Sequence, residues 1–232
     1  MPTDAERRLH PRIFDTDWLM LRGMTRVLGQ LVTRHVREGQ KVLDFGCGNR
    51  PYAPLFKGRE AIYLGADFGH EADVSIAPDG RIQLADASID IVISVQVLEH
   101  VRNLDVYFAE ISRILKPGGI LFLSTHGTWL YHPHPEDHRR WTRVGLINDI
   151  ETRGFAVREI ESIVGPLGTT TMIRSTGYAV FQRRIPLVGG LIAGAIATVM
   201  NLRGLMEEAV TPAQIRFDNG CVYVTRCEKH PS

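Results

Sequence analysis

The stretch VLDFGCGNRPY, residues 42–52, decides the fold, because an apolar run leads directly into a glycine-rich turn. The first four residues are typical of a short buried strand, and Gly46 and Gly48 predict a tight turn after it. A dinucleotide-binding turn would place a third glycine three positions after the second, where this chain has Pro51. The turn is therefore expected to form the floor of a ligand site, but one that differs from a pyrophosphate site.

Working outward from this stretch, strands and helices alternate along the chain. Helices are predicted over 15–38, where Asp15 or Thr16 caps the start and Gly39 ends it, over 104–116, and over 142–153. Strands are predicted over 41–47, 61–67, 89–95, 120–125, 155–163 and 220–227. Alternation of this kind predicts a single doubly wound α/β domain over 1–232, with a mainly parallel sheet covered by helices on both faces. A helical insert is expected over about 166–210, before the last strand.

The composition excludes several classes of protein. Lysine and arginine total 27 against 26 acidic residues in 232, so no strong basic field indicates a nucleic-acid partner. Three cysteines without a C-x-x-C pair argue against a disulfide framework. The first residues carry charge but no apolar core of a secretory signal, and we expect a cytoplasmic protein.

Two acidic residues indicate which ligand the turn holds. Asp67 ends the second strand about twenty residues after the turn, where a carboxylate can accept hydrogen bonds from ribose hydroxyls. Asp44 precedes the turn, and an acid there is unfavourable beside phosphates but favourable beside an ammonium or sulfonium group. A nicotinamide cofactor and an adenosyl cofactor both fit the ribose acid. The absent third glycine and Asp44 favour S-adenosylmethionine, which carries both cations and no phosphate.

Residues 41–162 resemble the class I S-adenosylmethionine-dependent methyltransferases of the type 11 kind. VLDFGCG is similar to the first motif of that family, DASIDIVISVQVLEHV to its fourth-strand segment, and EISRILKPGGILFLST to the helix, turn and fifth strand that follow. The resemblance implies a seven-stranded Rossmann-like sheet, methyl transfer and S-adenosylmethionine as cofactor. The cofactor contacts expected from the residues and the resemblance together are Asp44, Gly46, Cys47, Gly48, Asp67, Phe68, Asp79 and Gln96.

The chain departs from the family pattern in two places. Asn49-Arg50-Pro51 replaces the small residues frequent after the first motif, and Ile82-Gln83-Leu84 stands where leucine-proline-phenylalanine is frequent. The second departure affects the adenine contacts. Asp79 is a candidate partner for the exocyclic amine, but Asp79-Gly80 also reads as a plain turn.

Histidines after the fourth and fifth strands are the candidates for acid–base chemistry. His100 belongs to the shared LEHV segment, so shaping the cofactor pocket is the favoured role for it. The segment HGTWLYHPHPEDHRRWT, 126–142, combines histidines with aromatic faces and is expected to bind the acceptor. Arg140 and Trp141 are expected to brace the following helix. The predicted catalytic residues are His126, His132, His134 and Asp137.

A metal is the alternative use of this segment. His132 and His134, with Asp137 or His138, have the side-chain types that transition metals prefer. No cysteine lies near them in the sequence, and clusters of histidine arise without a metal. We therefore expect no metal.

The expected function is methyl transfer to a small-molecule, glycan or lipid-linked acceptor, with oxygen as the favoured nucleophile. The alternatives are a cofactor-binding, non-catalytic partner subunit and a nicotinamide oxidoreductase. The uncharged stretch 185–202, flanked by Arg183-Arg184 and Arg203, is read either as a buried or lid-forming helix or as a peripheral membrane contact at the inner face. The sequence does not define the oligomeric state.

Overall fold

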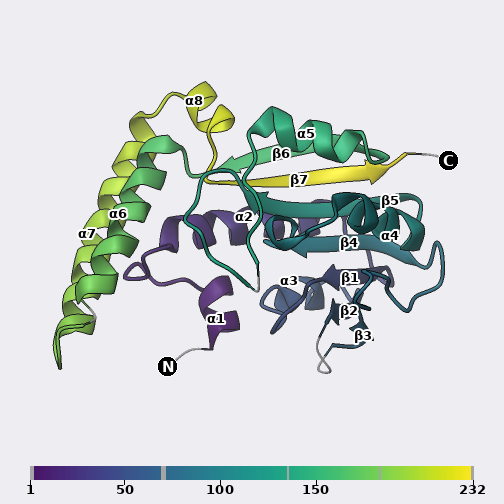
Figure 1. Ribbon diagram of the computed structural model, residues 1–232, viewed down its shortest axis with the longest axis horizontal. Helices are drawn as coiled ribbons and strands as arrows, with labels where there is room; N and C mark the ends of the chain where they lie inside the picture. Colours follow the sequence, from purple (N-terminus) through teal and green to yellow (C-terminus); the bar gives the residue numbers. More distant parts are fainter. Residues whose placement is uncertain (1–2, 69–71, 135, 183, 231–232) are drawn as a thin grey trace.

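The computed structural model describes residues 3–68, 72–134, 136–182 and 184–230, and a seven-stranded sheet forms the centre of this part of the chain (Figure 1). The strand order is β3-β2-β1-β4-β5-β7-β6. Neighbouring strands from β3 to β5 run parallel, whereas β7 is antiparallel to both of its neighbours. The predicted doubly wound, mainly parallel sheet is confirmed. The strands are β1 Lys41–Phe45, β2 Ile62–Asp67, β3 Val74–Ser75, β4 Ile89–Val95, β5 Leu115–His126, β6 Phe155–Ile163 and β7 Val222–Lys229.

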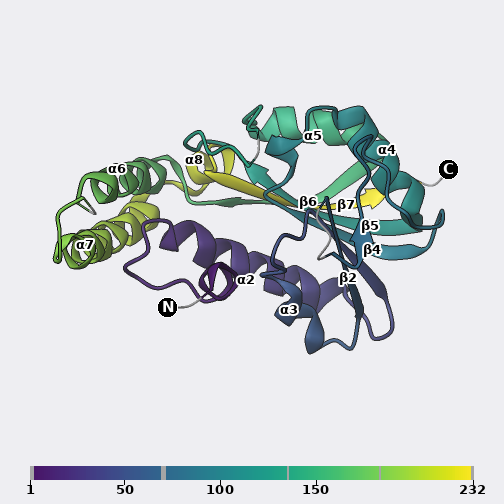
Figure 2. The ribbon, with the colours of Figure 1, turned by 60° about the horizontal axis from the view of Figure 1, so that its bottom comes forward.

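Helices cover both faces of the sheet (Figure 2). One face packs against α2 (Trp18–His35) and α3 (Ala53–Lys57), and the other against α4 (Leu104–Ile114) and α5 (Arg143–Glu151). Successive residues of β1 alternate between the two cores, since Val42 belongs to the first and Leu43 to the second. The central strands are therefore buried on both sides, which explains their nearly continuous apolar sequence.

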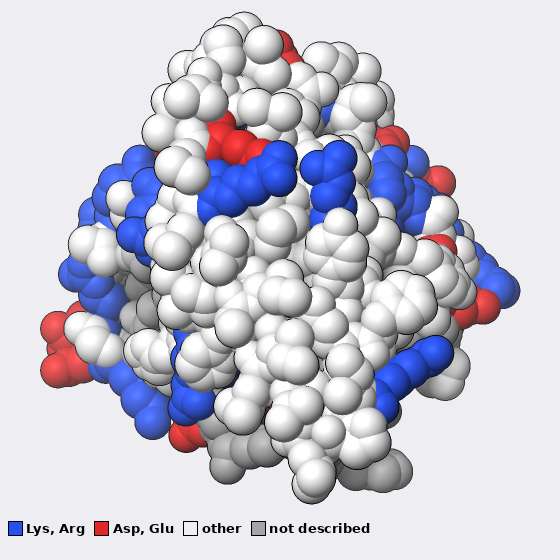
Figure 3. Space-filling model, turned by 90° about the vertical axis from the view of Figure 1, so that its left-hand side faces the viewer, with Lys and Arg blue, Asp and Glu red and all other residues white. Residues whose placement is uncertain are grey.

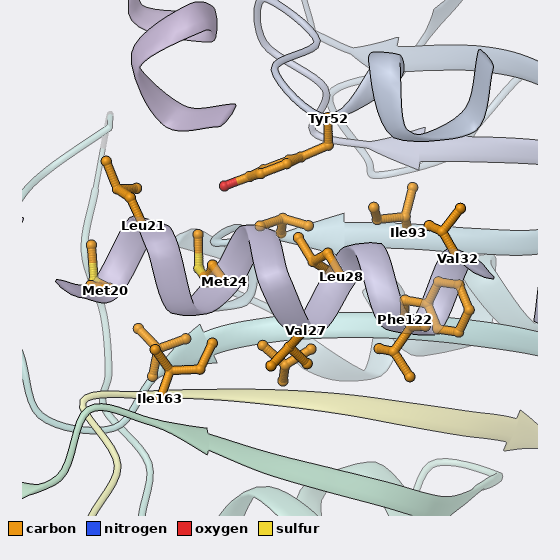
Figure 4. Close-up of a cluster of buried hydrophobic side chains, with 14 of the residues drawn as sticks. Met20, Leu21, Met24, Val27, Leu28, Val32, Tyr52, Ile93, Phe122 and Ile163 are labelled. Atoms are coloured by element: carbon orange, nitrogen blue, oxygen red, sulfur yellow. The ribbon is translucent and has the colours of Figure 1, made fainter. Parts of the chain in front are cut away.

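The helix α2 fills the first core with one apolar stripe. Met24 and Leu28 lie one turn apart and are both buried, in a cluster that also contains Phe122 of β5 and Ile163 of β6 (Figure 4). The helix is shorter than the predicted 15–38 and begins after Asp17, whose side chain makes no capping hydrogen bond.

The predicted caps of this helix are wrong. The Asp15 carboxylate accepts the backbone N–H of Arg12 in the loop before the helix, so it is not free to cap α2. A further short helix, α1 (Asp4–Leu9), was not expected. It is stabilised by a reciprocal capping box between Thr3 and Glu6.

The strand β5 begins earlier than predicted. It starts at Leu115 and includes the Pro117-Gly118-Gly119 turn, which was expected to separate helix from strand. Leu115 pairs with Ile89 of β4, and the register then shifts before Ile120. Because Pro117 cannot continue the helix α4, the chain pairs with β4 directly after the helix ends.

Between β6 and β7 the chain forms a long helical hairpin that projects from the body of the molecule (Figures 1 and 2). It consists of α6 (Pro166–Gln182) and α7 (Gly189–Val210), and α8 (Ala213–Asp218) leads back to the sheet. The side-chain amide of Asn201 donates to the carbonyls of Ile13 and Asp15, which fixes the base of α7 to the N-terminal segment. Within the described residues, α7 alone is long and apolar enough to cross a membrane, by length and composition.

Candidate active site

The turn after β1 is shaped by its two glycines. Gly46 and Gly48 have φ angles of 74° and 48°, a left-handed conformation that strains other residues. A Cβ on Gly46 would lie 2.6 Å from Val97, whereas a Cβ on Gly48 would meet nothing within 4 Å. The first glycine thus allows close packing inside the protein, and the second leaves open space for a ligand above the turn.

Asp67 joins the end of β2 to this turn. Its Oδ2 accepts the backbone N–H of Gly48 at 2.8 Å, and its Oδ1 accepts the N–H of Phe68 at 2.7 Å. Each carboxylate oxygen keeps a further lone pair for a ribose hydroxyl. The next side chain, Phe68, is 66% exposed and offers an apolar ring face beside the same point. This arrangement fits the predicted ribose and adenine contacts.

Asp44 lies beneath the turn and not beside open space. It is 4% exposed and accepts a hydrogen bond from the Tyr63 hydroxyl of β2. Burial raises the pKa of Asp44 to about 7, although the bond from Tyr63 acts in the opposite direction. Tyr63 could not be predicted as its partner from the sequence, because their contact depends on the pairing of β1 with β2.

The Cys47 side chain is buried in the protein. A Cβ on Gly65 of β2 would lie 2.8 Å from its sulfur, so the thiol packs against that strand. Burial raises the pKa of the thiol to about 11, which keeps it neutral. The backbone of Cys47, and not its thiol, would therefore make the predicted contact with a cofactor.

Gln96 stands at the junction of β4 and β5. Its φ of 57° turns the chain at the end of β4, and its backbone N–H donates to the Ser124 carbonyl at 2.9 Å. The side-chain Nε2 donates to the Ser124 hydroxyl at 2.7 Å, while Oε1 is buried and has no partner among the described residues. This oxygen is free to accept a hydrogen bond from a ligand, as the predicted lining role requires.

Asp79 lies in a turn, in agreement with the second reading of Asp79-Gly80. Its Oδ1 accepts the backbone N–H of Arg81 at 3.1 Å, and Gly80 has a φ of 89°. The exposed Asp79 side chain also borders a cleft of about 830 Å³ between this loop and α4, where Val106 lies opposite. Both the turn and the adenine contact fit this position.

A buried histidine and a buried glutamate meet at the carboxyl ends of β4 and β5. His126 Nε2 lies 3.5 Å from Glu99 Oε1, and the side chains are 2% and 0% exposed. Glu99 Oε2 accepts the Thr125 hydroxyl at 2.8 Å. Burial raises the pKa of Glu99 to about 7 and lowers that of His126 to about 2, so the histidine is neutral. The ring of His126 stacks on Trp129.

The segment after β5 is held by an ion pair. Asp137 makes two bonds to the Arg140 guanidinium, at 2.5 and 2.6 Å, and Arg140 also donates to the carbonyls of Trp129 and Leu130. Arg140 thus ties the segment to itself, while the expected brace on the following helix comes from Trp141, whose indole N–H donates to Asp149 at 2.8 Å.

Asp137 also orients His132. Its Oδ2 accepts the backbone N–H of His132 at 2.9 Å and lies 3.5 Å from His132 Nδ1. The His132 ring packs edge-on against that of His126, with centroids 4.9 Å apart. Desolvation, followed by the nearby His100, lowers the pKa of His132. The structure therefore places His132 between the exposed loop and the buried Glu99–His126 pair.

His134 lies apart from the side chains that come close enough to share a metal ion. His134 is exposed, and its ring centroid lies 6.0 Å from that of His132. In the described part of the chain, the ligand atoms close enough for one ion belong to Glu99, His100 and His132, within 4.8 Å of one another. The set weighed as a metal alternative, His132 and His134 with Asp137 or His138, is not the set that comes together. His100 Nδ1 already pairs with the Glu136 carbonyl at 2.5 Å.

The sheet order, the glycine turn and the acid that ends β2 define the class I S-adenosylmethionine-dependent methyltransferases, a class of enzymes that use that cofactor. The family described as Methyltransferase domain matches residues 20–160, and the chain belongs to this family. The hairpin lies outside the matched range.

Individual relatives support the same class. A probable S-adenosylmethionine-dependent methyltransferase of Mycolicibacterium smegmatis is 24% identical over 168 residues, 65% of this chain and 65% of that protein. A ubiquinone biosynthesis O-methyltransferase of Mesorhizobium japonicum is 34% identical over 103 residues, 38% of this chain and 41% of that protein. The alignments thus span less than two thirds of these relatives. A phosphoethanolamine N-methyltransferase 2 of Haemonchus contortus, solved with S-adenosylhomocysteine, shares the fold with a TM-score of 0.57 at 14% identity, covering 100% of this chain and 61% of that one.

Proposed function

We propose that the protein transfers a methyl group from S-adenosylmethionine to a hydroxyl oxygen of a small-molecule, glycan or lipid-linked acceptor. The observation that carries the proposal is the Asp137-oriented His132 beside the buried Glu99–His126 pair. These groups lie at the carboxyl ends of β4 and β5, the edge at which β1 ends in its glycine turn. Ligands of open α/β sheets bind at this edge.

The residues around the glycine turn would hold the cofactor. Gly48 leaves room for it, Asp67 accepts from its ribose, Phe68 covers its base and Gln96 Oε1 accepts a further hydrogen bond. When bound, the cofactor supplies a methyl carbon that its sulfonium already activates toward displacement. The chain then has to position the acceptor oxygen in line and remove its proton.

His132 is the proposed proton acceptor. His132 Nδ1 lies 3.5 Å from Asp137 Oδ2, and its Nε2 would take the hydroxyl proton as the acceptor oxygen attacks the methyl carbon that the cofactor would supply. The lowered pKa keeps His132 neutral at pH 7, which a base requires. His126 is too buried to reach the acceptor, and its proposed role is to position the His132 ring. The exposed His134 is proposed to contact the acceptor.

Two further observations support transfer to oxygen in a reducing compartment. An unactivated hydroxyl needs a base, and an oriented, neutral histidine supplies one. Relatives named ubiquinone biosynthesis O-methyltransferases match across 103 residues. All three cysteines are free and buried, and a cytoplasmic location is part of the proposal.

The test is methyl incorporation from labelled cofactor into cell extracts, followed by fractionation of the labelled product. We expect His132→Gln to lower kcat by about 10²–10⁴-fold and to leave cofactor affinity unchanged. The matched control is His138→Gln, since His138 lies on the same loop and pairs only with Glu136 through its ring. Equal loss in both variants would contradict the base assignment. No incorporation by the wild type, together with tight cofactor binding, would favour the non-catalytic partner subunit.

A further inference from the structure

We propose that the tip of the α6–α7 hairpin docks on an anionic lipid surface. The hairpin tip is defined here as the described residues of 178–192, which comprise the end of α6, the connection and the start of α7. The inference concerns where the protein binds and holds for any acceptor. It takes up the second of the two readings of 185–202, peripheral membrane contact, and extends it to both helices.

The hairpin tip exposes apolar side chains that no part of the described chain covers. Leu187 is fully exposed, Leu191 is 77% exposed and Phe181 is 69% exposed. Figure 3 looks onto this side and shows a broad uncharged surface with Lys and Arg along its margins. Scattered exposed apolar residues need no explanation, but a contiguous patch marks an interaction site. The other apolar residues exposed at the tip are Tyr178, Val180, Ile185, Val188 and Ile192.

Leu187 occupies a position that folding alone disfavours. Its φ is 65°, a left-handed conformation in which Asn, Asp and Gly are common and branched apolar residues are rare. Its side chain gains nothing from burial, because it is entirely exposed. A leucine there is accounted for by contact with an apolar phase outside the protein.

The positive charge of the hairpin indicates that this apolar phase is an anionic lipid bilayer. The hairpin 166–210 contains four arginines, at 174, 183, 184 and 203, against two acids, Glu207 and Glu208. Both acids lie at the base of the hairpin, where Arg203 pairs with Glu207 at 2.7 Å, so no acidic residue offsets the arginines nearer the tip. Arg174 and Arg184 are exposed near the tip, where they can meet lipid phosphates once the apolar residues enter the interface. A second copy of the same face carries the same positive charge and therefore does not complement it, because a two-fold interface uses the same patch on both copies. An anionic bilayer complements this surface.

The hairpin is built to lie at the interface and not to cross the bilayer. The helix α7 packs along α6, its small residues Ala193 and Ala197 are buried, and the Asn201 amide is bound to the N-terminal segment. At the base, Glu207 accepts the Thr171 hydroxyl and Glu208 accepts the Gly165 backbone N–H. Spanning would break these contacts, whereas insertion of the tip leaves them intact.

The hairpin rises from the edge of the sheet that carries the candidate active site. Val222 of β7 pairs with Ile163, the last residue of β6, and also with His126, the last residue of β5. The helix α6 begins three residues after Ile163. A surface bound through the tip therefore faces the same side of the molecule on which the acceptor is expected to bind.

The experiment is flotation of the full chain with vesicles of phosphatidylcholine alone or mixed with phosphatidylglycerol, at 0.1 and 0.5 M salt. We expect binding to the mixed vesicles and weaker binding at high salt. The double variant Leu187→Asp/Leu191→Asp should lower binding at least tenfold. Arg174→Glu/Arg184→Glu should lower it about fivefold or more for each arginine removed. The controls are Val144→Asp, an exposed valine on α5, and Lys57→Glu, an exposed lysine on α3.

Folding is checked separately, because all variants should keep the thermal midpoint and the S-adenosylhomocysteine affinity of the wild type. Aspartate suits the left-handed position 187, so Leu187→Asp is expected to fold. The proposal is overturned if the wild type binds neither kind of vesicle, or if the tip variants bind as well as the wild type. It is also overturned if light scattering shows a dimer that the tip variants dissociate while vesicles remain unbound. None of these outcomes depends on methyl transfer.

Discussion

The backbone N–H of Gly48 donates to Asp67 Oδ2 at 2.8 Å, so the floor of the site and its ribose acid form one unit. We expect Asp67→Ala to weaken S-adenosylmethionine binding by about 1–3 kcal/mol, because it leaves ribose hydroxyls and a backbone donor without a partner. Calorimetric titration measures this loss. Asp79→Ala serves as the comparison and should change the affinity little if Asp79 only stabilises its turn. Unchanged binding in Asp67→Ala would show the ribose assignment to be wrong.

The two glycines of the turn should respond differently to alanine. Gly46→Ala combines a left-handed φ with a 2.6 Å approach to Val97, and we expect it to lower the free energy of unfolding by more than about 2 kcal/mol. Gly48→Ala meets no protein atom and should cost about 1 kcal/mol, yet it places a methyl group where the ligand lies. Thermal unfolding and cofactor titration separate the effects. If Gly48→Ala binds the cofactor as tightly as the wild type does, the cofactor must lie elsewhere.

The raised pKa of Asp44 predicts that the stability of the fold depends on pH. Burial raises its pKa from 3.8 to about 7, so between these values the folded protein holds a proton that the unfolded chain has released. Stability should therefore fall as pH rises from about 4 to 7. Glu99, whose pKa burial also raises to about 7, adds to the same slope. Asp44→Asn should flatten part of the decline in thermal midpoint between about pH 4 and 7, and a slope equal to that of the wild type would exclude Asp44 as its source.

The pH profile of the reaction should report His132. Burial and the nearby His100 lower the pKa of His132 below its usual 6.5, so kcat/KM should rise with pH through a value below 6.5 and then level off. The charge of Asp137 raises this pKa. Asp137→Asn should therefore move the acidic limb to lower pH as well as reducing the rate. If the acidic limb of the profile does not move in Asp137→Asn, it reports the titration of a group other than His132.

Chelation tests the metal alternative. Glu99 Oε2 accepts from Thr125 and His100 Nδ1 pairs with the Glu136 carbonyl, so two of the three side chains near a common point have protein partners. We expect activity to survive dialysis against EDTA. The opposite result would be that EDTA abolishes activity and that one divalent ion restores it in the wild type but not in Glu99→Gln. That result would assign an ion to Glu99, His100 and His132.

Local sequence predicted the turn and every strand except the two-residue β3, because each of these is a local pattern. The apolar run before Gly46 and the acid that ends β2 can be read without knowing what packs on them. The bond between Tyr63 and Asp44 depends on how β1 pairs with β2, and the Glu99–His126 contact on how β4 pairs with β5. Pairing across strands leaves no short-range pattern, so these partners emerged only from the structure.

Boundaries were the other weak point of the sequence analysis. Asp15 and Thr16 are both good capping residues, but the chain before α2 uses the Asp15 carboxylate for a loop contact. The Pro117-Gly118-Gly119 turn ends α4 as expected, yet it is drawn into β5 by pairing at Leu115. In both cases tertiary contacts outweighed local propensity.

Because Ile163 and Val222 are paired neighbours, the sheet closes at the same point whatever length of chain connects them. The intervening segment is thus a module that can be exchanged for another without changing the register of β6 and β7. If the hairpin docks on lipid as proposed, methyl-transfer chemistry and membrane placement can diversify independently. Chimaeras that replace 166–210 alone offer a route to retargeting this enzyme class.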